Sequence, residues 1–255
     1  MRISPYVADS MHLDVWQKFE KIVKETLNTA SKIIDVSLED IEQGDGLLSK
    51  FQNSVSSRED IHRIFADFII AAGDTTAFST LWCLYLLAKH QTVQEKVRFS
   101  IIQSGDLESP LIRATVKETL RMFPVAPFIG RFLDQDSIIG GYNIPKNTLA
   151  LLSLYSAGRD ETNFLRPNEF IPQRWMRGNE RSESYQPFNV NASLPFAMGS
   201  RSCVGRRIAL YQMHFLLSKL LQHYKITVDN TEVEAELKLV TIPKNKFKLM
   251  FTNFN

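Results

Sequence analysis

One short segment places a cysteine where it could bind a metal ion. Cys203 lies in FAMGSRSCVG, just before a helical pattern and two residues after Arg201. The positive end of a helix favours the thiolate, which is the form of cysteine that binds metals. Gly199 and Gly205 would let the backbone approach a flat, bulky group, and Arg201 would bind a carboxylate. The opposing interpretation is that Cys203 is a small buried apolar residue, as lone cysteines usually are.

Two acid-containing pairs could also do chemistry. Glu118 and Arg121 in KETLR share one face of a predicted helix, with the acid first, which is the favourable order. An exposed pair of this kind contributes only about 0 to 1 kcal/mol, so the pair alone is a weak signal. Asp74 and Thr75 in AAGDTT lie inside a long apolar pattern, where a buried aspartate is costly unless it is paired. Either small residues allow close helix packing there, or the acid and the alcohol have a chemical role.

The elements that position these residues are mostly helices. Apolar residues at helical spacing predict helices at about 11–34, 57–90, 92–103, 110–123 and 204–223. The second of these is apolar on almost all sides at its centre, which predicts burial within a large protein. Short β-like segments are predicted at 128–152 and 224–254, with a long irregular segment at 160–200. The predicted fold class is mainly α with a small β part, in a single partial domain over residues 1–255.

Composition excludes several classes of protein. The chain has 255 residues, a formal charge of +2 and 44% hydrophobic residues, which argues against nucleic-acid binding and against disorder. Its two cysteines exclude a disulfide-rich scaffold, and its five histidines form no HExxH motif. The charge-free apolar run 75–88 is shorter than the roughly 18 residues of a membrane-spanning helix. The opening MRISPYVADSMH has the features of neither a signal nor a transit peptide, so no targeting segment is expected in this chain.

The cysteine segment resembles the haem-binding signature of the cytochrome P-450 superfamily, F-x-x-G-x-R-x-C-x-G. All five fixed positions match: Phe196, Gly199, Arg201, Cys203 and Gly205. In that family the cysteine thiolate is the axial ligand of the haem iron. The resemblance implies that Cys203 is the metal ligand, that Phe196 packs beside the sulfur and that Arg201 binds a haem propionate.

Two other motifs occur in the order typical of the family. NEFIPQRW resembles its second arginine motif, which implies that Glu118, Arg121 and Arg174 form a buried network that orders the cysteine loop. Gln173 stands where many relatives have Glu. AAGDTT resembles the oxygen-activating motif, which implies that the catalytic pair Asp74 and Thr75 delivers protons beside the haem.

Further residues acquire expected roles from the same resemblance. Arg131 is similar to a second propionate-binding arginine of the family, and Ala72 stands where its oxygen-activating motif usually has glycine. Arg206 and Arg207 occupy a first helical turn, where the helix dipole disfavours cations, so they indicate an anionic neighbour or a solvated face.

The segments LIRATVKETLR and CVGRRIA resemble the mitochondrial branch of the family. This implies that Arg113 and Lys117, four residues apart, dock an acidic adrenodoxin-type ferredoxin; a solvated face is the other explanation. The similarity to insect mitochondrial hydroxylases of ecdysteroid synthesis implies a lipophilic, steroid-like substrate and O2. It also implies association with the mitochondrial inner membrane, with membrane contact through the N-terminal half of the family's fold.

The resemblance covers nearly the whole chain but only about the C-terminal half of the family's fold. We therefore expect a haem-thiolate monooxygenase fragment that inserts one oxygen atom of O2 into a lipophilic substrate. The alternative hypothesis is a truncated, haem-free fragment without enzymatic activity.

Overall fold

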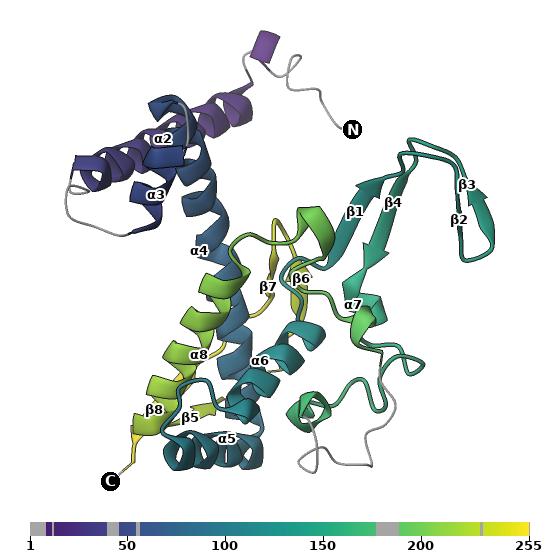
Figure 1. The fold of residues 1–255 in the computed structure, drawn as a ribbon. Coiled ribbons are helices and arrows are strands. Elements are labelled where there is room, and N and C mark those ends of the chain that lie inside the picture. Colours follow the sequence, from purple (N-terminus) through teal and green to yellow (C-terminus); the bar gives the residue numbers. More distant parts are fainter. Residues whose placement is uncertain are drawn as a thin grey trace. The chain divides into compact units, whose positions relative to one another are not determined.

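The chain is described by a computed structural model that covers residues 9–11, 13–39, 46–54, 57–176, 189–229 and 232–254. It divides into two compact units, Met1–Gly73 and Asp74–Asn255. The helices are α2 (Asp14–Glu39), α3 (Leu47–Ser54), α4 (Arg58–Lys89), α5 (Gln91–Ser104), α6 (Pro110–Met122), α7 (Leu154–Ala157) and α8 (Arg206–His223) (Figure 1). Short 3-10 helices are η2 (Pro172–Trp175), η5 (Val190–Ala192) and η6 (Gly199–Arg201).

The strands form small antiparallel pairs. They are β1 (Phe128–Phe132) with β4 (Leu149–Ser153), β2 (Ser137–Ile139) with β3 (Tyr142–Ile144), β5 (Tyr224–Val228) with β8 (Leu249–Asn253), and β6 (Ala235–Leu237) with β7 (Thr241–Pro243). The predicted fold class, mainly α with a small β part, is confirmed. The five predicted helices correspond to α2, α4, α5, α6 and α8, whereas α3 was not predicted because glycine and polar residues flank so short a segment.

In the smaller unit, α2 packs against the beginning of α4. Ala30 and Ile34 are buried together with Ala66. Phe51 of α3 makes edge-to-face contacts with Phe65 and Phe68 at centroid distances of 5.4 and 6.3 Å. These aromatic contacts explain why the short segment around Phe51 is helical, because its ring needs an apolar partner.

The core of the larger unit lies between the C-terminal part of α4 and helices α5, α6 and α8. Its main cluster consists of Cys83, Leu87, Ala88, Val97, Ile101, Ile112, Val116, Leu120, Met213, Leu217, Leu221 and Ile226. A second cluster surrounds Trp82, whose ring stacks on Phe123 at 4.0 Å and whose Nε1 donates to Thr241 O at 3.3 Å. These contacts attach β7 to the helices.

A buried amide fixes β5 against the helices. The Gln94 side chain of α5 donates to Ile226 O at 2.8 Å and accepts from Ile226 N at 2.9 Å. It also donates to Leu87 O in α4 at 3.0 Å. One side chain therefore links α4, α5 and β5.

In this chain, neighbouring helices cover only the C-terminal part of the long apolar helix α4. Its residues 79–88 are buried or half-buried, but Ile69 and Ile70 are 40% and 50% exposed. The reason is that apolar character buries a helix only where neighbours cover it, and α5, α6 and α8 cover the C-terminal end. By length and composition alone, α4 could cross a membrane, and no other helix of the described part of the chain could. Asp67 and Asp74 interrupt its apolar run, and its C-terminal end packs into the core of the larger unit.

Candidate haem-thiolate site

The cysteine expected to bind haem lies at the surface. Cys203 is exposed between η6 and α8, and its N–H donates to Phe196 O at 2.9 Å. We call residues 196–205 the Cys203 turn. Ala197 and Gly199 have φ angles of 54° and 73°, in the left-handed region that is costly for residues other than glycine. The alternative interpretation, a buried apolar Cys203, is therefore wrong.

The second cysteine has the opposite environment. Cys83 of α4 is 0% exposed and belongs to the main apolar cluster. Burial raises the pKa of the Cys83 thiol to about 12, so this thiol is protonated at neutral pH. Of the two cysteines, Cys203 is thus the one that a ligand in solution can reach.

Gly199 and Gly205 serve the Cys203 turn in different ways. The positive φ of Gly199 favours glycine at this position. Gly205 caps α8 with a φ of −80°, and an added Cβ there would lie 3.9 Å from Cys203 Sγ, an ordinary contact. The backbone therefore does not demand Gly205, but its missing side chain leaves the sulfur less covered.

The predicted propionate-binding arginines are both exposed. Arg131 lies in β1, where its Nη1 donates to Gly130 O at 2.7 Å, and Arg201 ends η6. Within the described residues, neither guanidinium forms an ion pair with a carboxylate, so both can accept an anionic ligand. Phe196 packs partly against the main core cluster, and the Arg206 guanidinium lies 5.9 Å from its ring centroid.

The expected burial of Asp74 is wrong. Asp74 is exposed on α4, and Thr75 beside it is half-buried. The Thr75 carbonyl accepts a hydrogen bond from Ser79 Oγ at 2.7 Å. Because water solvates the Asp74 carboxylate in this chain, its charge needs no buried partner. Asp74 therefore carries no desolvation cost that another residue must offset.

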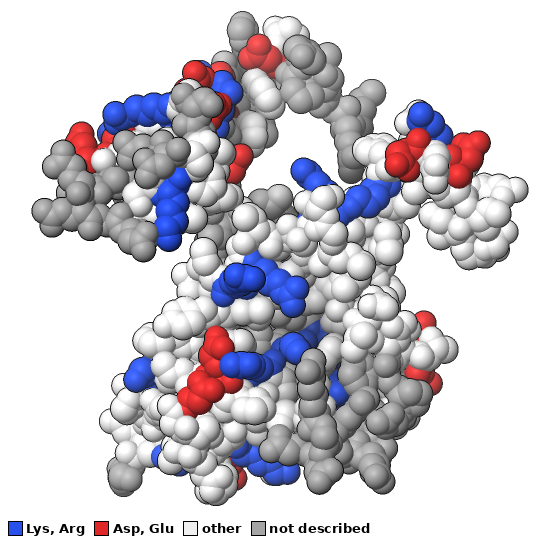
Figure 2. Space-filling model, in the orientation of Figure 1, with Lys and Arg blue, Asp and Glu red and all other residues white. Residues whose placement is uncertain are grey.

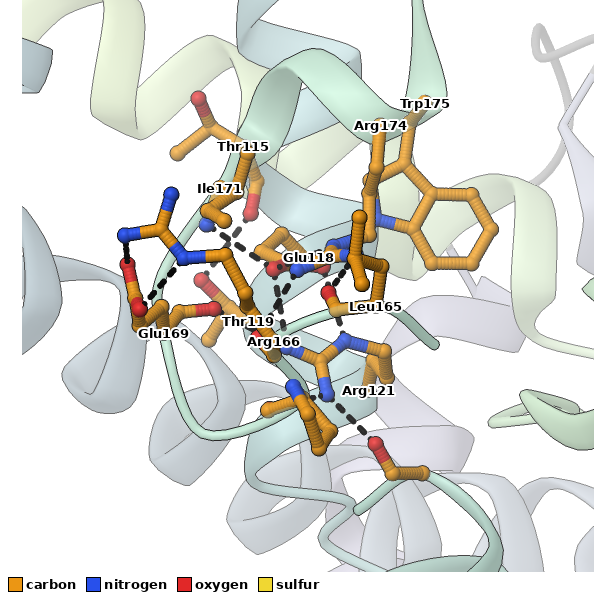
Figure 3. Close-up of polar contacts among 12 residues, drawn as sticks. Thr115, Glu118, Thr119, Arg121, Leu165, Arg166, Glu169, Ile171, Arg174 and Trp175 are labelled. Carbon is orange, nitrogen blue, oxygen red and sulfur yellow. Dashed lines mark hydrogen bonds and ion pairs between the residues drawn. The ribbon is translucent and has the colours of Figure 1, made fainter. Parts of the chain in front are cut away.

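The structure brings Glu118, Arg121 and Arg174 together in a buried ionic cluster (Figure 3). Glu118 Oε1 accepts from Arg121 Nη2 at 2.8 Å and from Arg174 Nε at 3.0 Å. Its Oε2 accepts from Arg121 Nε at 2.9 Å and from Trp175 Nε1 at 2.8 Å. The backbone N–H of Ile171 adds a bond to Oε1 at 2.9 Å. We call Glu118, Arg121, Arg174 and Trp175 the Glu118 cluster.

Backbone carbonyls balance the second positive charge of this cluster. Arg121 Nη1 donates to Gly158 O and Pro167 O, and Arg174 donates to Leu165 O at 2.9 Å and Arg166 O at 3.2 Å. The side chains of Glu118, Arg121 and Arg174 are 0% exposed. Since every one of these donors is directed at an oxygen, the loop over residues 158–171 is fixed around two guanidinium groups.

Trp175 and Gly158 are two functional positions of this site that were not predicted from the sequence. The indole N–H of a half-buried tryptophan needs an acceptor, and this requirement is the signal that could have identified Trp175. Gly158 is required by sterics, because an added Cβ would lie 2.8 Å from the Arg121 carbonyl oxygen. No local sequence pattern could reveal this contact, since it joins a loop to a helix far away in the chain.

Two hydrogen bonds attach the segment that precedes the Cys203 turn to the loop that the Glu118 cluster fixes. Asn163 Nδ2 donates to Ala157 O at 3.1 Å, beside Gly158. Asn189 N donates to Asn163 O at 2.8 Å, which attaches the chain segment leading to the cysteine. Ala192, in that segment, is buried.

The residues expected to dock a partner lie on α6 and are exposed. Arg113 Nη2 is 2.9 Å from Glu108 Oε2, and Lys117 Nζ is 6.0 Å from the centroid of the Trp175 ring. Figure 2 shows Lys and Arg side chains gathered on the face where Figure 1 draws α6 and α8, beside a group of acidic side chains. Glu108 also faces His214 of α8, a contact that the sequence did not reveal.

Known proteins resemble this chain over three quarters of its length or more. It is 39% identical to "Cytochrome P450 315a1, mitochondrial" of Drosophila melanogaster, over 98% of this chain and 48% of that protein. It is 39% identical to "Cholesterol side-chain cleavage enzyme, mitochondrial" of Hypanus americanus, over 76% of this chain and 38% of that protein. The chain spans about half the length of the first of these relatives and less of the second.

The fold also matches a solved structure. The crystal structure of a cytochrome P450, CYP102L1, superposes with a TM-score of 0.77 at 23% identity, covering 91% of this chain and 56% of that one. Residues 3–251 match the family model described as Cytochrome P450. The expected family and its mitochondrial branch are confirmed, and the chain belongs to the cytochrome P450 family.

Proposed function

We propose that this chain is the haem-binding portion of a mitochondrial monooxygenase that hydroxylates a lipophilic, steroid-like substrate. The observation that carries the proposal is the exposed Cys203 at the beginning of α8, within a complete haem-binding signature. Relatives named as a cholesterol side-chain cleavage enzyme and as sterol 26-hydroxylases support the substrate class. Their names also support a mitochondrial location.

The residues of the Cys203 turn fit a haem group. Cys203 would bind the iron as a thiolate. Arg131 and Arg201, both exposed cations without a carboxylate partner among the described residues, would bind the propionates. When bound, the haem supplies the activation of O2 and the cleavage of its O–O bond.

Asp74 and Thr75 would supply protons for that chemistry. The exposed Asp74 carboxylate can exchange protons with solvent, and the Thr75 hydroxyl can pass a proton on as both donor and acceptor. The Glu118 cluster would keep the cysteine in place, through the loop contacts at Asn163 and Asn189. Its role is therefore one of positioning.

An acidic adrenodoxin-type ferredoxin would deliver the electrons. Arg113 and Lys117 on α6, with Arg206 and Arg207 on α8, give this face exposed positive charge. Complementary charge of this kind governs mainly the association rate and its dependence on salt.

The test is a haem titration of the full chain. A pyridine-haemochrome assay measures bound haem, and the reduced, CO-treated protein should show the thiolate-dependent absorption band for which the family is named. Cys203→Ala should lose that band, whereas Cys83→Ala should keep it. A chain that binds no haem would support the haem-free alternative, and a band that persists in Cys203→Ala would refute the assignment of the ligand.

A further inference from the structure

The turn between α5 and α6 is attached to α8 by polar contacts that the proposed chemistry does not use. Ser218 Oγ donates to Leu107 O at 2.6 Å, and His214 Nδ1 lies 3.3 Å from Glu108 Oε1. His214 is 5% exposed. The helix that begins just after Cys203 therefore carries a buried imidazole in contact with a half-buried carboxylate.

Glu108 is shared between two basic side chains. Its Oε2 accepts from Arg113 Nη2 at 2.9 Å, while its Oε1 faces His214. A carboxylate can only accept, so the hydrogen of the neutral imidazole must be on Nδ1. His214 Nε2 is then a bare acceptor, and it is buried without a hydrogen-bond partner among the described residues. This nitrogen is the place where an additional proton would bind.

The charges around His214 come from two sides. Glu108 acts on it from the turn, and Arg113 and Lys117 act on it from α6. Within the described part of the chain, helix α5, which also packs against α8, places no charged group close enough to His214 to act on it. Burial lowers the pKa of His214 most strongly, Glu108 opposes that effect, and the two cations add to it. Neutralising the cations would therefore favour the imidazolium.

We propose that an acidic protein which binds Arg113 takes this arginine away from Glu108. Glu108 then pairs with His214 alone, and His214 Nε2 takes up one proton from solvent when the acidic protein binds. This inference rests on the proposed function, since it takes Arg113 as part of the docking surface. The proton adds to the imidazole lone pair, and no covalent bond is broken. Docking would then tighten the contact between the turn and the helix that carries the cysteine, and docking would be stronger at lower pH.

The first experiment needs no partner protein. Nuclear magnetic resonance of the histidine rings in the full chain follows the titration of His214, which a His214→Gln spectrum identifies. Arg113→Gln should raise the midpoint of that titration. Arg166→Gln is the matched control, because Arg166 is as exposed as Arg113, 53%, and is likewise paired with a carboxylate. An unchanged midpoint in Arg113→Gln, or an equal rise in the control, would overturn the sharing of Glu108.

The second experiment measures the proton at docking. Calorimetry with an acidic [2Fe–2S] ferredoxin, in two buffers of different ionisation enthalpy, should show proton uptake by the unmodified chain near pH 6.5. His214→Gln should still bind the ferredoxin at pH 8 but without the uptake at pH 6.5. If His214→Gln still takes up a proton when the ferredoxin binds, His214 is not the site of protonation and the inference is overturned, although the ferredoxin does dock. If the ferredoxin does not bind at all, the docking proposal fails, and the first experiment separately decides whether Glu108 is shared.

Discussion

The Glu118 cluster and the Cys203 turn hold charged groups in opposite ways. In the Glu118 cluster, two guanidinium groups and one carboxylate are 0% exposed, and each has several hydrogen-bond partners. In the Cys203 turn, the sulfur and Arg201 are exposed, and left-handed backbone at Ala197 and Gly199 shapes the loop. The difference shows that buried charged groups of this chain have their hydrogen-bond partners within the chain, whereas Cys203 and Arg201 remain accessible to a ligand. Substitutions in the two regions should therefore differ sharply in their effects.

The largest expected effect is the loss of the central carboxylate. Glu118→Ala should lower the free energy of unfolding by about 3–5 kcal/mol, because it leaves two buried guanidinium groups without their counter-ion. Urea denaturation followed by circular dichroism measures this change. Glu59→Ala is the control, since Glu59 forms an exposed pair with Arg63 and should change stability by about 0.5 kcal/mol or less. Equal effects of the two substitutions would contradict the comparison.

Gly158→Ala should destabilise the chain by about 1–3 kcal/mol, because its Cβ would meet the Arg121 carbonyl oxygen at 2.8 Å and the backbone must move. Gly73→Ala is the control, because it should change the free energy of unfolding in the opposite direction. Gly73 lies within α4 with no atom within 4 Å of an added Cβ, so alanine there should stabilise by roughly 1 kcal/mol. The same denaturation experiment measures both. A neutral Gly158→Ala would show that the loop around Arg121 adapts easily.

Trp175→Phe tests the fourth member of the Glu118 cluster. It keeps an aromatic ring but removes the N–H that donates to Glu118 Oε2, so a loss of about 1.5 kcal/mol is expected for a bond to a charged acceptor. Thermal unfolding measures the loss. Trp16→Phe, whose N–H donates to the exposed Asp9, should cost much less. Similar losses in both variants would show that the indole N–H adds nothing to the cluster.

A smaller effect is expected from pH. The pKa of His214 lies below its ordinary value of 6.5 in the folded chain, mainly because of burial. Between the two pKa values the unfolded chain binds more protons, so the free energy of unfolding should fall as the pH decreases below about 6.5. Burial also lowers the pKa of His90, which contributes in the same direction. The difference between the unmodified chain and His214→Gln, measured by denaturation at pH 5 to 8, isolates His214. Parallel curves for the two proteins would contradict this prediction.

The smallest expected effect on stability is that of replacing Cys203. The two cysteines should nevertheless differ clearly in their reactivity toward thiol reagents. Cys203→Ser should change the free energy of unfolding by about 0.5 kcal/mol or less, because the side chain is exposed. In the folded chain a thiol reagent such as dithionitrobenzoate should label Cys203 and not Cys83, whose thiol is buried and has a raised pKa of about 12. Labelling of Cys83 at a similar rate would show that the core of the larger unit opens readily.

Much of this molecule could be predicted from its sequence. The periodicity of apolar residues located α4, α5, α6 and α8 to within a few residues, and motif order led to Glu118, Arg121 and Arg174. Contacts between distant segments could not be predicted, because periodicity reports the environment of an element and not the identity of its neighbour. Glu108 with His214, and Gly158 with Arg121, are examples. The exposure of Asp74 on an apolar helix was missed for the same reason.

The buried Gln94 amide has a consequence for the behaviour of the chain in solution. A pair of strands normally presents unpaired backbone groups along each outer edge, and such edges recruit strands from other molecules. Ile226 N–H donates to the Gln94 side chain, and the Ile226 carbonyl accepts from both Gln94 and Gln91. Gln94 thus imitates a third strand at this position, and it should protect β5 from the edge-to-edge association that begins aggregation.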